Sequence, residues 1–84
     1  MNGDQARDIV IAAITDVAPD VDPATVRGAD SLSIDLELDS IDFLAVVARL
    51  AEETAIEIPE EDYRELATVD ACANYVASHA VGAA

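Results

Sequence analysis

Apolar residues recur at helical spacing in the first segment of the chain, from about Asp4 to Val17. They are three or four residues apart, which places them on one face of an amphipathic helix. These positions are Ala6, Ile9, Val10, Ala13 and Val17. Pro19 and Pro23 follow, and each restricts the residue before it to an extended conformation. We therefore expect a helix that ends at about Val17 and a loop that begins at Ala18.

The next segment alternates strictly between apolar and polar residues, with Leu32, Ile34, Leu36 and Leu38 as its apolar members. A period of two is typical of a strand. No second segment has a matching pattern, however, and a strand without a partner leaves its backbone groups unpaired. We therefore interpret Ala18 to Leu38 as an extended loop whose alternate apolar side chains pack on a helical core. Loops of about 20 residues are uncommon in compact domains and tend to be functional.

A second helix is predicted to begin at Ser40 and to end at Thr54. Asp39 is a suitable N-cap, and Asp42 stands where a capping box has its acidic residue. The expected core face contains Phe43, Val46, Val47 and Leu50, with Leu44 and Ala51 beside it. The residues expected to face water are Asp42, Arg49, Glu52 and Glu53.

Two shorter helical segments complete the pattern. Ile56 and Ile58 return to the core, and Pro59 opens a short helical turn from Glu60 to Leu66. Thr68 is expected to cap a last helix, with residues 81–84 fraying after it. The buried face of that helix is expected to contain Val69, Cys72, Ala73, Val76 and Ala80. The predicted fold is all-α: a bundle of three main helices plus one short helix, with a long loop between the first two helices, as a single domain over residues 1–84.

Charge restricts the possible partners of this bundle. The 84 residues contain 18 acids and four arginines, so the formal net charge is −14. This charge repels nucleic acid and anionic membranes and favours a partner with a basic face. A content of 52% apolar residues separates the chain from acidic disordered tails. The single cysteine forms no internal disulfide, and we find no signal peptide or membrane span, so we expect a cytoplasmic monomer.

The acidic residues are concentrated in one part of the chain. Residues 30–62 contain 11 acids and only Arg49 as a base, a net charge of −10, whereas the remainder has a net charge of −4. Most of the negative charge therefore surrounds the start of the second predicted helix.

Catalytic and metal sites are poorly supported by the sequence. Cys72 and His79 lie seven residues apart on one helix, about 10.5 Å along its axis, too far to share a proton. Two such ligands are also too few for zinc. Asp35, Glu37 and Asp39 have the spacing of a calcium loop, but Ser40 and Val46 stand where such a loop needs glycine and glutamate. We therefore expect no catalytic residue and no metal.

The run Asp39-Ser40-Ile41-Asp42 resembles the signature of the acyl carrier protein family, in which the serine bears 4′-phosphopantetheine. The resemblance covers about residues 5–80 in order, and three further segments contribute to it. These segments are Asp35 to Leu38, Ile56 to Glu61, and Ala67 to Val69 with Asn74 to Val76 behind it. A serine at a helix start also suits a phosphodiester, because free backbone N–H groups and the positive end of the helix dipole lie there.

The resemblance implies a carrier that is not itself an enzyme. A phosphopantetheinyl transferase would modify Ser40, and the arm would then hold acyl or polyketide intermediates as thioesters for fatty-acid, polyketide or related lipid biosynthesis. Acyl-loading, ketosynthase or acyltransferase-type enzymes with basic faces would dock on Asp39, Ile41, Asp42, Glu52 and Glu53, and secondarily on Glu60, Glu61 and Asp62. A further hypothesis, based on the abundance of small alanine contacts, is that the acyl chain slips between helices lined by Phe43, Val47, Leu66, Cys72 and Val76.

The chain departs from the family pattern at four positions. Glu37 replaces a glycine of the signature, Ala45 and Ala48 replace residues that are often acidic or bulky, and Arg49 adds a positive charge. The Gly-Gly signature of peptidyl carriers is absent, and Met1 suggests a discrete carrier. Two alternatives stay open: an unmodified acidic helical module that binds a basic partner, and a hydrolase or thiol enzyme that uses Cys72 or His79.

Overall fold

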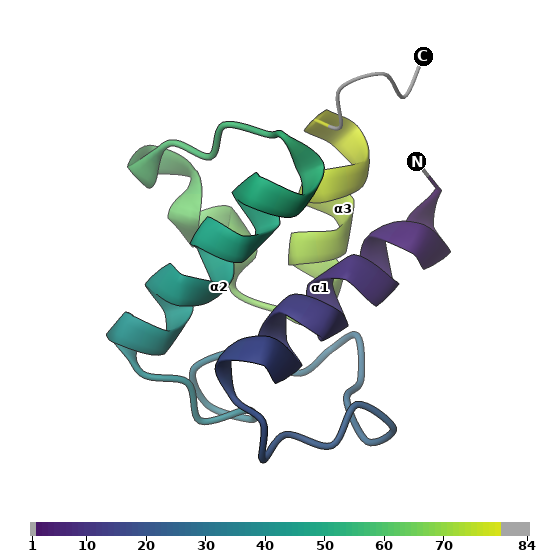
Figure 1. The fold of residues 1–84 in the computed structure, drawn as a ribbon, viewed down its shortest axis with the longest axis vertical. Helices are drawn as coiled ribbons and strands as arrows, with labels where there is room; N and C mark the ends of the chain where they lie inside the picture. Colours follow the sequence, from purple (N-terminus) through teal and green to yellow (C-terminus); the bar gives the residue numbers. More distant parts are fainter. Residues whose placement is uncertain (1, 80–84) are drawn as a thin grey trace.

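The computed structural model describes residues 2–79, which form four helical elements (Figure 1). These are α1 (Gly3–Val17), α2 (Ser40–Thr54), the 3-10 helix η1 (Glu60–Leu66) and α3 (Val69–His79). The predicted all-α bundle of three main helices and one short helix is therefore confirmed, including the long loop between α1 and α2. Ala80 and the predicted frayed segment 81–84 lie outside the described residues, so the single domain over residues 1–84 stays a prediction.

Helix α1 is the central element, because it packs against both α2 and α3. It begins at Gly3, one residue before the predicted start, because Asn2 and Gln5 form a capping box: each side chain bonds the backbone N–H of the other residue. The residues buried along α1 are Ala6, Val10, Ala13 and Ile14. The sequence reading omitted Ile14, whereas Ile9 and Val17, which it placed in the core, are only partly buried.

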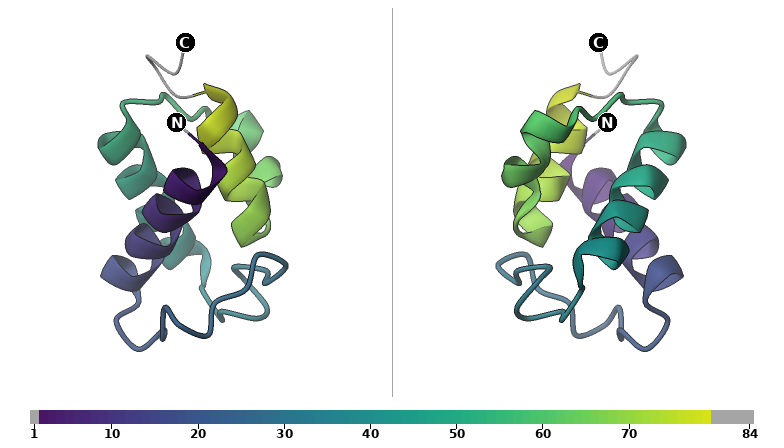
Figure 2. Two further views of the ribbon diagram at one scale, coloured as in Figure 1. Left: turned by 90° about the vertical axis from the view of Figure 1, so that its right-hand side faces the viewer. Right: turned by 90° about the vertical axis from the view of Figure 1, so that its left-hand side faces the viewer.

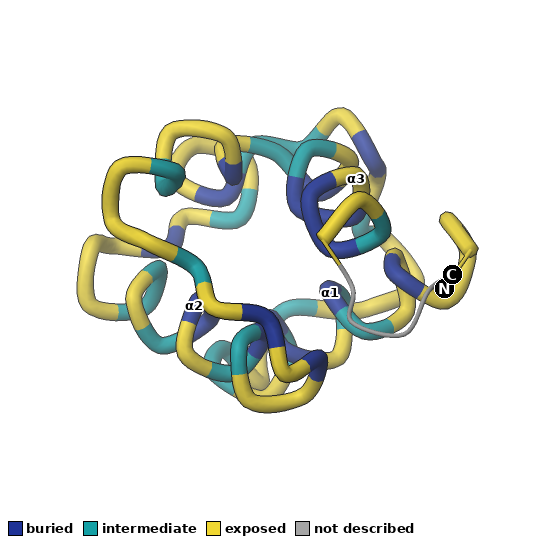
Figure 3. The backbone as a smooth tube through the Cα atoms, turned by 90° about the horizontal axis from the view of Figure 1, so that it is seen from above, coloured by how far each residue is buried: buried dark blue, intermediate teal, exposed yellow. Residues whose placement is uncertain are grey.

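The buried side chains of all the helices meet in one hydrophobic core, and Figure 3 marks the buried residues in dark blue along the backbone. On α3 the buried residues include Val69, Cys72 and Val76, as predicted, together with Tyr75. Tyr75 was not predicted there, and it is only 4% exposed. Its hydroxyl donates a hydrogen bond of 2.7 Å to Asp62 of η1, which explains how a phenol is accommodated in the core.

The loop between α1 and α2 runs across one end of the bundle (Figure 2). Leu32 and Leu38 are buried in the core and Leu36 is partly buried, as expected. The prediction is wrong for Ile34, whose residue surface is 78% exposed. The physical reason is that the loop is not extended here. The N–H groups of Asp35 and Leu36 both donate to the Ser31 carbonyl, and these turns carry Ile34 to the outside.

Backbone hydrogen bonds fasten this loop to the start of α3. The Leu32 N–H donates to the Ala67 carbonyl over 3.0 Å, and the Val69 N–H donates to the Asp30 carbonyl over 3.1 Å. Thr68 also caps α3 as predicted, because its hydroxyl accepts from the Ala71 N–H. The loop is therefore anchored on both sides before it delivers the chain to Ser40.

Candidate functional site

Ser40 is the first residue of α2, and this helix starts at the end of the bundle where the α1–α2 loop runs (Figure 1). The preceding residues hold it there: Leu38 is 5% exposed and donates its N–H to the Leu32 carbonyl over 2.9 Å. Asp39 then caps the helix, since its carboxylate accepts the Asp42 N–H over 2.8 Å. Ser40 itself is exposed, with a buried anchor two residues before it. Its hydroxyl is therefore both accessible and positioned by fixed backbone.

The first turn of α2 keeps donors available beside Ser40. The Asp42 and Phe43 N–H groups both bond to Asp39, one to its side chain and one to its carbonyl. The N–H groups of Ser40 and Ile41 have no acceptor among residues 2–79. Two unpaired N–H groups at the positive end of a helix suit a phosphodiester on the Ser40 oxygen. The residues present therefore fit a phosphopantetheine group at this position.

The backbone just before the site is unusual at Glu37. Its φ of 56° lies in the left-handed region, which favours glycine. The resemblance places a glycine of the family signature at this position, so the conformation is the one a glycine would adopt. The chain keeps the turn and adds a carboxylate three residues before Ser40.

Exposed apolar side chains surround Ser40, which sequence reasoning recognised only in part. Ile41 is 75% exposed, as its predicted docking role requires, but Ile34 at 78% and Leu44 at 50% are exposed as well. Ile34 had been placed toward the core, and Leu44 beside the core face. The sequence did contain a signal for the exposure of Leu44. Leu44 lies three residues after Ile41, so the two side chains are neighbours on one face of the helix.

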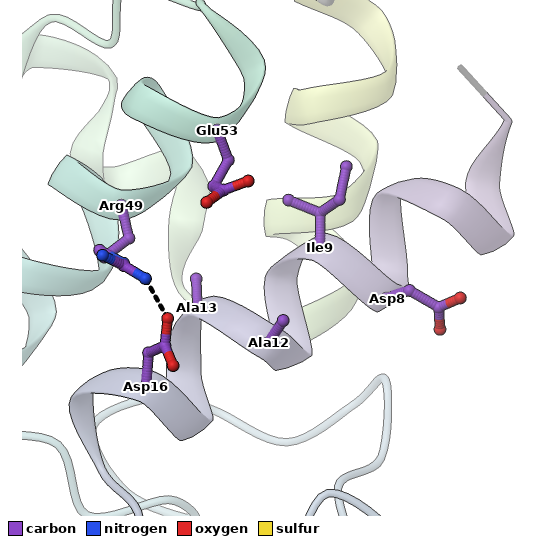
Figure 4. A pocket seen from close by; sticks show the side chains of 7 residues that line it. All are labelled: Asp8, Ile9, Ala12, Ala13, Asp16, Arg49 and Glu53. Atoms are coloured by element: carbon purple, nitrogen blue, oxygen red, sulfur yellow. Dashed lines mark hydrogen bonds and ion pairs between the residues drawn. The ribbon is translucent and has the colours of Figure 1, made fainter.

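The five predicted docking residues lie on two different faces of α2. At 100° per residue, Glu52 shares a face with Ile41, Leu44 and Ala48, all of which are exposed. We call these four residues the outer face of α2. Glu53 is turned away from this face and points toward α1 (Figure 4). Asp39 and Asp42 lie in the cap and first turn, with Asp39 exposed and Asp42 partly buried.

Arg49 faces water in part, as predicted, but it also has a partner on another helix. It forms an ion pair with Asp16 of α1, and its side chain is 42% exposed (Figure 4). The positive charge expected on the docking helix is thereby paired, and it links α2 to α1. Of the secondary docking residues, Asp62 accepts the Tyr75 hydroxyl, while Glu60 and Glu61 are exposed.

Cys72 and His79 have structural roles. Burial raises the pKa of the Cys72 thiol to about 12, so it is protonated near neutral pH, and the thiol donates to the Leu66 carbonyl with an Sγ–O distance of 3.5 Å. His79 stacks on Tyr75 with ring centroids 4.0 Å apart, and its Nδ1 lies 2.9 Å from the Tyr75 carbonyl. Neither side chain has the setting of a nucleophile and its base.

Comparison with known families decides which kind of protein carries this exposed serine. Residues 8–76 match the family model described as "Phosphopantetheine attachment site", a range that contains Ser40. An acyl carrier protein of Rubrobacter xylanophilus is 32% identical over 76 residues, covering 87% of this chain and 94% of the relative. The chain belongs to the acyl carrier protein family.

Two further relatives extend the comparison. An acyl carrier protein of Bdellovibrio bacteriovorus is 41% identical over 56 residues, which cover 67% of this chain and 72% of the relative. "Acyl carrier protein 2, mitochondrial" of Arabidopsis thaliana is 37% identical over 59 residues, 70% of this chain. This chain spans about half the length of that mitochondrial relative, since the match covers 47% of it.

Membership of the acyl carrier family decides several expectations. Acyl carriers are not enzymes, and the phosphopantetheine attachment site identifies their cofactor. Family membership also implies a phosphopantetheinyl transferase and acyl-processing enzymes as partners. Among residues 2–79, no helix of this carrier is both long and apolar enough to cross a membrane. Its cytoplasmic localisation stays a prediction, because the relatives include both bacterial and mitochondrial proteins.

The residues predicted to line the acyl pocket lie together in the core of the carrier. Val47, Leu66, Cys72 and Val76 are buried, and Phe43 is partly buried with its ring edge against Tyr63, centroids 5.7 Å apart. Among the described elements, α2 approaches neither α3 nor η1 as closely as it approaches α1. The predicted pocket residues come from α2, η1 and α3.

Proposed function

We propose that Ser40 carries 4′-phosphopantetheine and that this protein tethers acyl or polyketide intermediates as thioesters. The observation that carries the proposal is the exposed hydroxyl at the capped start of α2, with two backbone N–H groups free beside it. The phosphopantetheine thiol supplies the thioester chemistry when the group is bound. The protein holds the attachment oxygen at a fixed place and raises the effective concentration of the cargo at each partner.

Attachment requires only a nucleophilic oxygen from this chain. A transferase would remove the proton from the Ser40 hydroxyl, whose oxygen forms a new P–O bond to the phosphopantetheine phosphate of coenzyme A. The bond to the leaving adenosine bisphosphate breaks in the same exchange. Asp39 and Asp42 leave the first turn acidic, so covalent attachment rather than affinity holds the phosphate there.

The partners proposed are a phosphopantetheinyl transferase and acyl-loading, ketosynthase or acyltransferase-type enzymes with basic faces. The outer face of α2 supports a mixed contact, because Ile41, Leu44 and Ala48 expose apolar surface and Glu52 adds a charge at its end. Apolar contacts would supply affinity, and the surrounding acids would mainly accelerate encounter and set orientation. The pathway proposed is fatty-acid, polyketide or related lipid biosynthesis, in the cytoplasm.

Intact-mass measurement tests the attachment directly. Co-expression with a broad-specificity phosphopantetheinyl transferase should add the mass of one phosphopantetheine to the wild-type chain. Ser40→Ala should abolish the addition, while Ser33→Ala, at an exposed loop serine, should leave it unchanged. A wild-type chain that stays unmodified with several transferases would contradict the proposal and would favour the unmodified acidic module.

We also propose that a long acyl chain enters between α2 and the α3–η1 side, against Phe43, Val47, Leu66, Cys72 and Val76. The wider spacing of α2 from α3 and η1 supports this path, because separating them breaks fewer close backbone contacts. Backbone chemical shifts of the holo and long-acyl forms should differ at these residues. Shifts that stay unchanged there would rule the pocket out.

A further inference from the structure

Helices α1 and α2 enclose a hollow of about 230 Å³ that the carrier site does not use (Figure 4). Its floor is apolar and comes from α1: Ile9, Ala12 and Ala13. Arg49 and Glu53 line it from α2, and Asp8 and Asp16 complete its rim on α1. We call this hollow the α1–α2 groove. The alanines are small, which leaves room where larger side chains would have closed the helix pair.

Among residues 2–79, a cation pairs with one of the three carboxylates that line the groove. At one end, Arg49 of α2 pairs with Asp16 of α1. One turn farther along α2, Glu53 projects toward the Ile9–Ala13 turn of α1 (Figure 4). No cation pairs with Glu53 or with Asp8 among residues 2–79. The groove therefore has a net charge of −2, with its unpaired carboxylates on both helices beside an apolar floor.

We propose that the α1–α2 groove receives an arginine side chain from a basic helix of a partner protein. Charge complementarity supports this occupant, and Arg49 shows within the same groove how a guanidinium bridges toward α1. A guanidinium is planar and weakly hydrated, so it packs on the apolar floor while bonding carboxylates at its edge. The aliphatic stem of the arginine covers the alanines, as such stems do on apolar surface.

This contact would lie apart from the outer face of α2 and would fix how a docked partner is rotated about that helix. Glu52 and Glu53 are neighbours in sequence, but only Glu53 lines the groove. A partner that engages both Glu52 and the groove straddles α2. The inference rests on the proposed carrier function, which supplies the basic partner, but the groove itself is testable without modification of Ser40.

The experiment uses two probes on the unmodified 84-residue chain, followed by methyl NMR at low ionic strength. The probes are n-butylguanidinium and its uncharged isostere n-butylurea. n-Butylguanidinium should give saturable shifts centred on the methyl groups of Ile9, Ala12 and Ala13, and n-butylurea should not. Glu53→Gln should weaken binding about threefold, as expected for one exposed charge. Glu52→Gln is the matched control and should leave the affinity unchanged.

A helical peptide represents the partner in the second arm. An alanine-based helix with one central arginine should compete with n-butylguanidinium, and its citrulline analogue should compete about threefold less. Shifts centred on Ile41 and Leu44 would overturn the proposal that the arginine binds in the α1–α2 groove. Equal weakening of binding by Glu53→Gln and Glu52→Gln would overturn it as well. A diffusion coefficient that falls as protein concentration rises would identify a second copy as the occupant and would also overturn it. Failure of phosphopantetheine attachment in the mass experiment would leave these shifts unaffected, so the two proposals fail separately.

Discussion

The two ends of α2 have similar backbone anchors but expose different chemistry. At each end a left-handed residue precedes a buried aliphatic side chain: Glu37 before Leu38, and Ala55 before Ile56. The N-terminal end then exposes Ser40 behind a carboxylate cap. The C-terminal end has Glu52 in its last turn and no basic residue there. The anchors are alike, so the difference lies in the exposed side chains.

This difference separates charges that stabilise the helix from charges that do not. Carboxylates at the N-terminal end, such as Asp39 and Asp42, interact favourably with the positive end of the helix dipole, and Asp39 also accepts the Asp42 N–H. Carboxylates at the C-terminal end face the negative end of the dipole and oppose helix stability. The acids at the C-terminal end are therefore better explained by association than by folding.

Removing the two buried anchors should give the largest effects and should break the similarity between the ends. Leu38→Ala and Ile56→Ala should each lower the free energy of unfolding by about 2–4 kcal/mol, because both side chains are buried. Only Leu38→Ala should also slow loading of Ser40, since Leu38 fixes the chain just before the cap. Chemical denaturation measures the first effect, and mass-resolved loading kinetics measure the second. Equal slowing by both variants would mean that Leu38 does not position Ser40.

The cap of α2 should give the next largest effect. Asp39→Ala should cost about 1 kcal/mol, because it removes the acceptor of the Asp42 N–H. Asp39→Asn keeps a capping oxygen and should cost only a few tenths, so the pair separates capping from charge. If loading by a transferase depends on the cap, Asp39→Asn should be loaded at the wild-type rate. If Asp39→Ala and Asp39→Asn are both loaded more slowly, loading depends on the charge of Asp39 instead. Thermal unfolding and loading kinetics provide the two measurements.

Relieving the left-handed residues should stabilise both ends to a similar, smaller extent. A non-glycine residue in the left-handed region lowers stability by about 1–2 kcal/mol. Replacing it with glycine removes this cost, but part of the gain is lost because glycine loses more conformational entropy on folding. Ala55→Gly and Glu37→Gly should therefore each raise stability by about 0.5–1 kcal/mol. Gly3→Ala is the opposite substitution and serves as a control, because a Cβ added at Gly3 would have no neighbouring atom within 4 Å. Destabilisation by Ala55→Gly would contradict the left-handed C-cap.

The helices and the exposed serine at the start of α2 were predictable because local rules determine them. The start of α2 depends on a capping aspartate and on a helical period within the same segment, and η1 was bounded correctly at Glu60 and Leu66. The exposed serine followed from the signature around it. These features need no knowledge of how distant segments meet.

The errors arose where distant segments meet or where the backbone turns. Ile34 was misplaced because turns centred on the Ser31 carbonyl interrupt the alternation of faces. The ion pair of Arg49 was missed because its partner Asp16 is 33 residues away on another helix. Tyr75 was overlooked because its burial depends on Asp62 as an acceptor. The groove that separates Glu53 from Glu52 likewise depends on α1, which no pattern within α2 specifies.

The smallest expected effects test the charge difference between the ends of α2 most directly. Glu52→Gln should raise the free energy of unfolding by about 0.3 kcal/mol, because it removes a negative charge near the negative end of the dipole. Asp42→Asn, in the first turn, should lower it by a similar amount for the opposite reason. Added salt should shrink both effects, since exposed charges are screened over about 8 Å at physiological ionic strength. Denaturant titrations at low and high salt measure these differences, and the same sign at both ends would remove the dipole as their cause.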